Sequence, residues 1–213
     1  MYQNILFDLD GTLTNPGEGI TNSVAYALKK WKIEVKDKRE LYPFIGPPLM
    51  DSFQTYYQFS EEDSRRAVTY YREYFSEKGI YENEVYDGVR EMLEELKGKK
   101  KSLILATSKP EEFALRILKH FELYDYFDFV AGASMDGARS RKGDVIQYAL
   151  ESCKIVDLSS AIMVGDREYD IAGAKQAGMD SLGVLFGYGS YEELKRAGAT
   201  YLAKTVSDIL CFL

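Results

Sequence analysis

Residues 5–12 of this 213-residue chain read Ile-Leu-Phe-Asp-Leu-Asp-Gly-Thr. Three apolar residues lead into two carboxylates two positions apart and then a glycine, a pattern typical of a buried strand that ends in a loop. Because side chains two residues apart on a strand point the same way, Asp8 and Asp10 are expected to face one site. Two close carboxylates repel unless a cation intervenes, which favours a divalent metal with oxygen ligands. Taken alone, the pair fits a solvated strand-to-loop junction equally well.

Four more short apolar runs occur along the chain, at residues 103–106, 129–131, 161–164 and 182–185. Segments with helical spacing of apolar residues lie between them, at residues 89–96, 113–121, 145–150 and 171–178. Gly98 and Gly178 are the expected ends of two of these helices. Strands that alternate with helices predict an α/β fold, a Rossmann-like doubly wound parallel sheet with helices on both faces. In such sheets ligands bind at the carboxyl ends of the strands.

Residues 15–85 break this alternation, because they contain helical stripes but no convincing buried strand. Ser60 is a typical helix start, and this helix is expected to end at Gly79. We therefore predict a Rossmann-like core of residues 1–14 and 86–213, and a small helical cap domain of residues 15–85 inserted after the first strand. The many tyrosines of the insertion are interpreted as packing residues, with a base-stacking surface as the alternative.

Composition and charge exclude several classes of function. The net charge of −7 disfavours nucleic acid and anionic membranes as partners, because acidic proteins repel polyanions. Cys153 and Cys211 lie outside any metal-binding cluster, which argues against zinc and for reduced thiols in a cytoplasmic protein. His120 is the only histidine, so Ser/His and multi-histidine mechanisms are nearly excluded. We see no signal peptide and no apolar run of the roughly 20 residues that a membrane span needs.

Chemically useful side chains also follow other predicted strands. Residues 107–109 read Thr-Ser-Lys directly after one apolar run, and Asp166 and Asp170 follow another. Lys142 stands at the start of a predicted helix. Together these groups suit the binding of a phosphorylated ligand, with carboxylates for a metal, a hydroxyl and amides for phosphate oxygens, and an ammonium group for negative charge.

In this order, residues 8–12, Thr107, Lys142 and the pair Asp166 and Asp170 resemble the four motifs of the haloacid dehalogenase superfamily. The helical insertion after the first motif resembles the cap of the phosphoglycolate phosphatase-like branch. The resemblance covers essentially the whole chain, and the four motifs together are specific although each alone is weak. It implies a magnesium-dependent phosphatase that acts on a small phosphorylated metabolite.

The resemblance also implies a covalent mechanism. Asp8 would attack phosphorus in line and form an aspartyl phosphate. Asp10 would protonate the leaving oxygen and later take a proton from the hydrolytic water. Mg²⁺ would be held by Asp8, the backbone carbonyl of Asp10 and Asp166, with Asp170 in the outer sphere or as an alternate ligand. Glu168 is the alternative to Asp170 as the supporting carboxylate.

The phosphoryl group is expected to contact four residues of these motifs: Gly11, Thr107, Ser108 and Lys142. The ammonium of Lys142 would offset the charge of the nucleophile and of the phosphoryl group. Many relatives have proline after this lysine, whereas this chain has Gly143. Lys109, Arg141 or a shared role are therefore kept as alternatives to Lys142.

The second aspartate, Asp10, favours phosphoryl transfer over dehalogenation, because halide needs no proton on departure. A phosphatase ranks first and a sugar phosphomutase of the same superfamily second. A regulatory module with a retained but inactive site is the alternative from another class. Phosphoglycolate, a nucleoside monophosphate and a sugar phosphate all fit the core chemistry, and the protein is expected to be a monomer or a homodimer.

Selectivity among phosphate esters is expected to come from the cap, which can close over the strand ends and exclude water. Residues 44–48 read Phe-Ile-Gly-Pro-Pro and combine a flexible glycine with two rigid prolines. We predict that Phe44 and Gly46 help to form the substrate site, and that Phe44 and Ile45 face the substrate when the cap is closed. The alternative is a turn between helices that has no ligand role.

Overall fold

The computed structural model describes residues 2–213. The chain forms two compact units that divide at the junctions 15/16 and 84/85. One unit is Pro16–Glu84, called the insert below, and the other, the core, holds the remaining residues. Two short strands, β2 (Thr14–Asn15) and β3 (Glu84–Val85), form a separate two-stranded sheet where the chain passes from one unit to the other.

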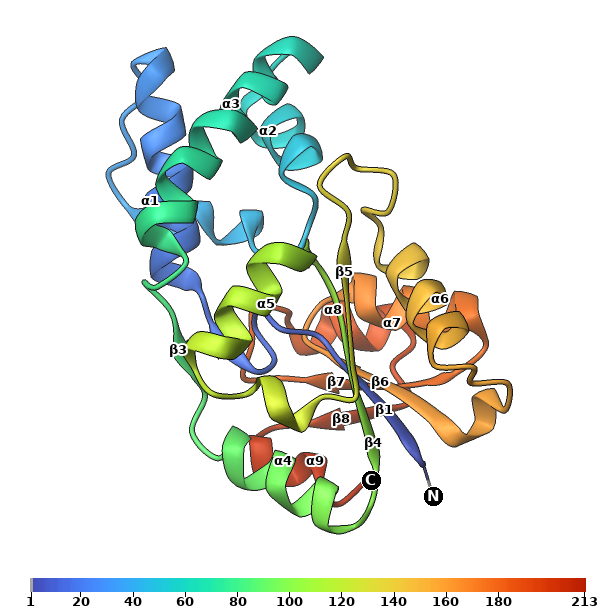
Figure 1. Cartoon of the computed structure of the whole chain (residues 1–213). Coiled ribbons are helices and arrows are strands. Elements are labelled where there is room, and N and C mark those ends of the chain that lie inside the picture. The colour runs from blue at the N-terminus through green and yellow to red at the C-terminus, as the bar shows by residue number, and fades with distance from the viewer. Residues whose placement is uncertain (1) are drawn as a thin grey trace. The chain divides into compact units, whose positions relative to one another are not determined.

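A six-stranded parallel sheet forms the centre of the core, in the order β5-β4-β1-β6-β7-β8 (Figure 1). Its strands are β1 Asn4–Phe7, β4 Ser102–Pro110, β5 Phe129–Ala133, β6 Ala161–Gly165, β7 Asp180–Val184 and β8 Tyr201–Ala203. All four residues of β1 pair with β4 on one side and with β6 on the other. The predicted α/β fold with a doubly wound parallel sheet is confirmed.

The order in which strands are added to the sheet changes sides at β1. It builds β4 and β5 on one side of β1 and then crosses to β6, β7 and β8 on the other side. Right-handed crossovers therefore place α4 and α5 on one face, and α6, α7 and α8 on the opposite face. α9 follows β8 and contacts α4 (Figure 1). The helices of the core are α4 Val89–Gly98, α5 Glu111–His120, α6 Lys142–Ser152, α7 Glu168–Ala177, α8 Tyr191–Ala197 and α9 Val206–Ile209, with short 3-10 turns at Tyr124–Tyr126 and Leu158–Ser160.

The sheet is apolar on both faces because helices cover both. Leu6, Ile104 and Met163 come from three adjacent strands and pack against Val145 of α6 and Ala174 of α7. The residues that alternate with them along β1, β4 and β6 are also fully buried. Burial on both faces explains why these strands are continuous apolar runs in the sequence.

Two helix ends of the core follow the predictions, whereas α3 of the insert (Glu61–Tyr74) and the strands β4 and β8 differ from them. α4 ends at Gly98, and Gly178 caps α7 with φ of 80°, as predicted. β4 extends to Pro110, beyond the predicted run 103–106, and its register against β5 shifts after Ala106. β8 lies outside the predicted strands, because it has only three residues and two of them, Tyr201 and Leu202, are half-buried.

The insert is helical. It contains α1 Gly17–Leu28, α2 Leu49–Tyr57 and α3 Glu61–Tyr74, with 3-10 turns at Lys29–Trp31 and Lys38–Phe44 and a π-helical turn at Phe75–Gly79. Ser60 accepts the N–H of Asp63 at 3.1 Å, which confirms the predicted start of α3. A Cβ atom on Gly19 would overlap the carbonyl of Gly79, so glycine lets α1 approach the π-helical turn.

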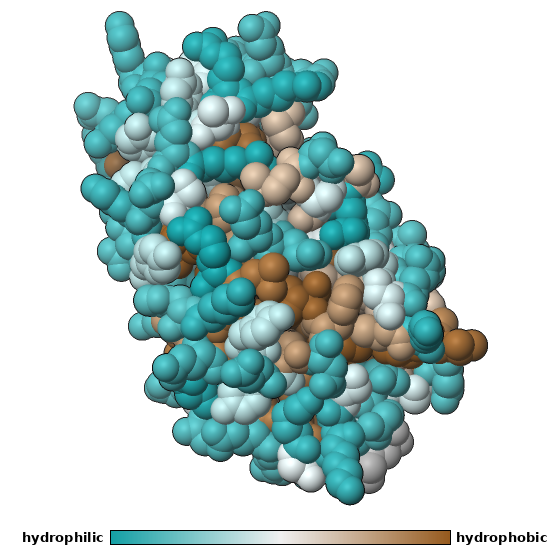
Figure 2. Space-filling view, viewed as in Figure 1, coloured by the Kyte–Doolittle hydropathy of each residue, from teal (hydrophilic) through white to brown (hydrophobic). Residues whose placement is uncertain are grey.

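The visible face of the molecule is hydrophilic over most of its area, and apolar side chains are exposed only in limited areas (Figure 2). Among residues 2–213, no helix has the length and apolar character needed to cross a membrane.

Candidate active site

The first strand carries Asp8 and Asp10 to the carboxyl end of the sheet. Asp8 directly follows β1, and its N–H still donates to Val164 of β6 at 2.9 Å, so pairing within the sheet fixes its backbone. The chain then turns sharply, because the carbonyl of Leu9 accepts the N–H of Thr14 at 3.0 Å. Both carboxylates are buried, which is unusual for acids unless a partner compensates the charge.

The irregular part of β4 carries the next group of side chains. Residues 107–109 follow the register shift at Ala106, and such irregularities redirect side chains near functional sites. Thr107 is buried, and its Oγ1 accepts the N–H of Lys109 at 3.2 Å. The hydroxyl hydrogen of Thr107 is then able to donate to a ligand oxygen. Ser108 is half-buried on the same segment.

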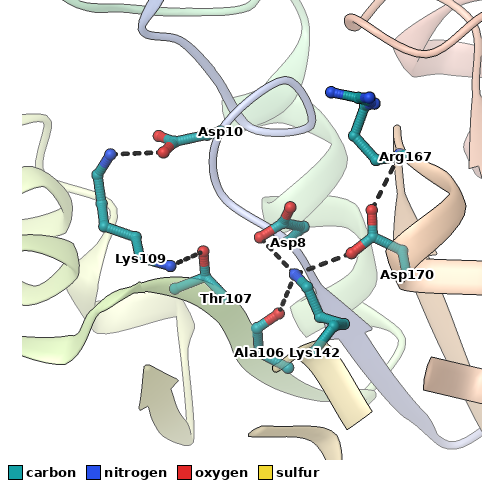
Figure 3. Close-up of polar contacts among 8 residues, drawn as sticks. All are labelled: Asp8, Asp10, Ala106, Thr107, Lys109, Lys142, Arg167 and Asp170. Carbon is teal, nitrogen blue, oxygen red and sulfur yellow. Dashed lines mark hydrogen bonds and ion pairs between the residues drawn. The ribbon is translucent and has the colours of Figure 1, made fainter. Parts of the chain in front are cut away.

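Lys142 is the first residue of α6 and connects three parts of the core. Its Nζ lies 2.8 Å from Asp8 Oδ1 and 2.8 Å from Asp170 Oδ1 (Figure 3). It also donates to the carbonyl of Ala106 at 2.9 Å. The ammonium group is therefore held beside the carboxylate expected to be the nucleophile.

The helices α6 and α7 approach each other closely beside Lys142. A Cβ atom on Gly173 of α7 would lie 2.9 Å from Ile146 and 3.2 Å from Cγ of Lys142, so glycine lets α7 pack against α6 and the stem of Lys142. A Cβ atom on Gly143 would lie 2.7 Å from the side-chain oxygen of Gln176, which is the far end of a flexible side chain and can move aside.

The other candidates for these roles lie elsewhere. Lys109 pairs with Asp10 at 2.5 Å, and Figure 3 shows this pair apart from Asp8 and Lys142. Burial raises the pKa of Asp10, although the ammonium of Lys109 opposes that shift. Arg141 is exposed at the start of α6. The side chain of Glu168 is 41% exposed and lies 3.8 Å from Arg196.

Asp166 and Asp170 complete a group of three buried acids. Asp166 directly follows β6, and Asp170 lies in the first turn of α7, where its Oδ2 accepts the N–H of Arg167 at 3.0 Å. A Cβ atom on Gly165 would overlap the Asp170 carboxylate, so glycine at the end of β6 makes room for it. One oxygen each from Asp8, Asp166 and Asp170 lie within 4.8 Å of one another.

Backbone surrounds the Asp166 carboxylate. Gly11 has φ of 82°, and a Cβ atom on Gly11 or Gly187 would overlap the Asp166 side chain. A Cβ on Gly189 would overlap the Asp166 carbonyl. The N–H of Tyr188 donates to Asp166 Oδ2 at 2.7 Å. Asp166 Oδ1 is buried and accepts no hydrogen bond from any residue that the structure describes.

The charges in this group are unbalanced. Burial, together with the charges of Asp170 and Asp8, raises the pKa of Asp166 well above its usual range. Burial raises the pKa of Asp170 to about 6 against the opposing effect of Lys142. Burial alone would lower the pKa of Lys142, but the carboxylates of Asp170 and Asp8 outweigh it and raise that pKa. Three acids and one ammonium group therefore leave a surplus of negative charge.

This surplus fits a hard divalent cation with oxygen ligands. The buried Asp166 Oδ1 has no other partner among the residues described, and the glycines around that carboxylate let backbone approach it where a side chain would collide with it. Asp170 uses one oxygen to cap α7 and the other to face Lys142, which suits a supporting position. The Asp10 carboxylate is bound by Lys109 and is not part of this group, so its contribution through the backbone carbonyl stays a prediction.

The predicted selectivity residues Phe44 and Gly46 belong to the insert. The ring of Phe44 is 2% exposed and packs 5.0 Å from Phe53 and 6.0 Å from Tyr57, measured between ring centroids. Gly46 has φ of 106° in the turn before α2. Phe44 is thus a packing residue of the insert, and its contact with substrate stays a prediction.

Sequence reasoning missed two features of the site. Lys109 was considered only as a rival of Lys142, whereas its side chain pairs with Asp10. Tyr188 binds Asp166 through its N–H, and its hydroxyl donates to Asn15, the last residue of the core before the insert. The signal that the sequence offers for this contact is the pair of glycines that flank Tyr188, Gly187 and Gly189.

Comparison with families of known sequence gives one match over most of the chain. The family model described as haloacid dehalogenase-like hydrolase matches residues 5–184. This range includes β1 from Ile5 onward, β4 to β7, and the residues Asp8, Asp10, Thr107, Lys109, Lys142, Asp166 and Asp170 of the site described above.

Individual relatives match almost the whole chain. A 5'-nucleotidase of Pseudomonas aeruginosa is 44% identical over 200 residues, which is 94% of this chain and 90% of that protein. Tyrosine-protein kinase PtkA of Mycobacterium tuberculosis is 34% identical over 209 residues, 97% of this chain and 71% of that protein. The crystal structure of a predicted phosphatase from Clostridium acetobutylicum has a TM-score of 0.97 and 50% identity and covers 100% of both chains.

Proposed function

The chain belongs to the haloacid dehalogenase-like hydrolases, and on that premise we propose that it is a magnesium-dependent phosphatase of small phosphate monoesters. The observation that carries the proposal is the position of Asp8. Its carboxylate lies 2.8 Å from the ammonium of Lys142 and within a group of three buried acids at the carboxyl end of the sheet. This is an arrangement for a nucleophile that must approach an anionic phosphoryl group.

In the first step the Asp8 carboxylate attacks phosphorus and the bond from phosphorus to the ester oxygen breaks. The departing oxygen takes a proton from the Asp10 carboxyl group, and an aspartyl phosphate remains. Lys142 and the hydroxyl of Thr107 hold the phosphoryl oxygens and offset their charge.

In the second step water attacks the phosphorus of the aspartyl phosphate. Asp10, now a carboxylate, takes a proton from that water, and the bond from phosphorus to Asp8 breaks. Inorganic phosphate leaves, and both aspartates return to their starting states. Asp10 thus gives one proton and recovers one in each cycle.

The group of Asp8, Asp166 and Asp170 is where the metal would bind. Bound Mg²⁺ supplies charge neutralisation and a fixed orientation for the phosphoryl group. Asp166 offers its unpartnered Oδ1 to the ion, and Asp170 keeps Lys142 in place.

Nucleoside 5'-monophosphates are the substrate class that we propose. The 44% identical relative is a 5'-nucleotidase, and its match extends over nearly all of both chains, which supports this choice. Phosphoglycolate is the second ester to compare, since the motifs also resemble the phosphoglycolate phosphatase-like branch. The acidic chain suits a small anionic substrate bound at local cations better than a polyanion.

Phosphate release from nucleoside monophosphates, phosphoglycolate and p-nitrophenyl phosphate, with Mg²⁺ and with chelator, tests the proposal. We expect release that depends on Mg²⁺ and that Asp8→Asn abolishes, because an amide is a poor nucleophile. Mass spectrometry of acid-quenched wild-type enzyme should show one added phosphoryl group on Asp8. Full activity in chelator, an active Asp8→Asn variant, or isomerised sugar phosphates without phosphate release would contradict the proposal.

A further inference from the structure

Lys109 and Asp10 form a buried ion pair that is separate from the three-carboxylate group. Lys109 Nζ lies 2.5 Å from Asp10 Oδ2, and the two side chains are only 5% and 11% exposed. Figure 3 shows this pair apart from Lys142, which contacts Asp8 and Asp170. The two buried ammonium groups therefore serve different carboxylates.

The two oxygens of Asp10 have different surroundings. Oδ2 is held by Lys109, whereas Oδ1 is buried and accepts no hydrogen bond within the described part of the chain. Buried polar atoms in native proteins are nearly always satisfied, and exceptions are found at catalytic sites. Oδ1 is therefore the oxygen of Asp10 that is available to a leaving group or a water molecule.

Contacts within the core hold the backbone of Lys109 in place. It lies in the irregular part of β4, and its N–H donates to Oγ1 of Thr107 at 3.2 Å. β4 is paired with β1, so Lys109, which lies in β4, and Asp10, which follows β1, belong to adjacent strands of one sheet. The ammonium group of Lys109 is thereby tied to the segment proposed to bind the phosphoryl group.

We propose that Lys109 is a positioning residue for Asp10, which it holds through Oδ2 so that Oδ1 faces the oxygen that exchanges a proton with it. The inference rests on the proposed function. In this role Lys109 neither gives nor takes a proton: Oδ1 of Asp10 does both, in the two steps described above. Without Lys109 the carboxylate would be free to rotate, which slows proton exchange but leaves attack by Asp8 in place.

The test compares Lys109→Met with wild type on an alkyl phosphate and on p-nitrophenyl phosphate, with Mg²⁺ present. The alkyl leaving group needs a proton, whereas the aryl leaving group needs little help. We expect kcat/KM on the alkyl ester to fall about tenfold more than kcat/KM on the aryl ester, because kcat/KM reports the step in which the leaving group departs, whereas hydrolysis of the aspartyl phosphate is common to both esters. Because the readout is a ratio measured on one sample, partial unfolding of the variant does not imitate the effect.

Two matched variants control for loss of a buried lysine. Lys101 directly precedes β4, is also buried, and donates through Nζ to the carbonyl of Tyr2 at 2.5 Å. Lys101→Met should lower both rates by the same factor. Lys109→Arg keeps a cation that can bind a carboxylate and should recover part of the ratio between the two esters.

A double variant separates the inference from the proposed function. Asp10→Asn should also favour the aryl ester, and adding Lys109→Met should change the ratio by less than about twofold, because both residues act on the same proton transfers. Two results would overturn the role of Lys109 and leave the proposed function in place. One is an equal loss of activity on both esters in Lys109→Met. The other is a double variant in which Lys109→Met changes the ratio between the esters as much as it does in wild type. An inactive wild type, or equal losses in Asp10→Asn, would overturn the proposed function and the inference with it.

Discussion

The Asp166 carboxylate is buried against two other acids, yet only one of its oxygens accepts a hydrogen bond from the residues described. In metal-free protein this carboxylate should therefore destabilise the fold. We expect Asp166→Asn to raise the melting temperature in chelator by roughly 2–6 °C, because the amide removes charge and can donate to its neighbours. The same variant should lose activity and the stabilisation by Mg²⁺. A lower melting temperature in chelator would show that Asp166 is a structural residue.

We predict that the loop between β7 and α8 supports Asp166 as a metal ligand. Its backbone closes around Asp166, and a Cβ atom on Gly187 would overlap both the Gly11 carbonyl and the Asp166 side chain. We expect Gly187→Ala to weaken Mg²⁺ binding at least about tenfold in a calorimetric titration. Gly98→Ala in α4 is the matched control, since a Cβ there meets nothing within 4 Å. Equal Mg²⁺ affinities in the two variants would count against the loop as a support for the metal ligand.

The 3-10 turn before α2 ends in Phe44. Two roles of the Phe44 side chain can be distinguished by experiment, namely packing within the insert and contact with substrate. The ring is buried among Phe53, Tyr56 and Tyr57, so Phe44→Ala should destabilise the insert by about 3–5 kcal/mol. Chemical denaturation followed by aromatic fluorescence checks this value. A stable variant with altered relative kcat/KM among phosphate esters would instead support the predicted contact with substrate.

The sequence predicts those features of the structure that depend on residues adjacent in the chain, and it does not predict those that depend on distant residues. The apolar run of residues 5–7 and the acids after it predict a strand and a site at its carboxyl end, because both depend on adjacent residues. The partner of Lys109 was not predictable, since it depends on a register shift in β4. The support of Asp166 by Tyr188 joins residues 22 positions apart through a loop without periodicity. Phe44 appeared suited to ligand binding because burial cannot be read from a Gly/Pro-rich turn.

The stability of the whole metal-free protein should depend on pH with a definite sign. The pKa of Asp170 is about 6 and that of Asp166 is raised further from its usual range, whereas an unfolded Asp has a pKa of about 3.9. The folded state therefore binds these protons more tightly, and the stability that they contribute is present at low pH and is lost as pH rises through the folded pKa values. In chelator, we expect a lower melting temperature at about pH 7.5 than at about pH 5.

Saturating Mg²⁺ should remove most of this decline, because the cation stabilises the ionised acids. Binding at a hundred times its dissociation constant adds about 2.7 kcal/mol, or roughly 5–10 °C for a chain of this size. Differential scanning fluorimetry at both pH values, with Mg²⁺ and with chelator, gives the melting temperature under the four conditions. Asp166→Asn lacks one of the two acids and serves as the comparison. If, in chelator, the melting temperatures of wild type and of Asp166→Asn rose equally between about pH 5 and about pH 7.5, this account would be contradicted.

The pairing of β2 with β3 has a consequence for the evolutionary history of the chain. These strands are the exit from the core and the return to it, so the two ends of Pro16–Glu84 lie side by side. A segment with adjacent ends can be lengthened, shortened or exchanged at little entropic cost to the host fold. Mutation and selection can therefore reshape the insert while the nucleophile, the acids and Lys142 are inherited unchanged, and descendants of one ancestral core can acquire new substrates by transplanting a single continuous stretch of sequence.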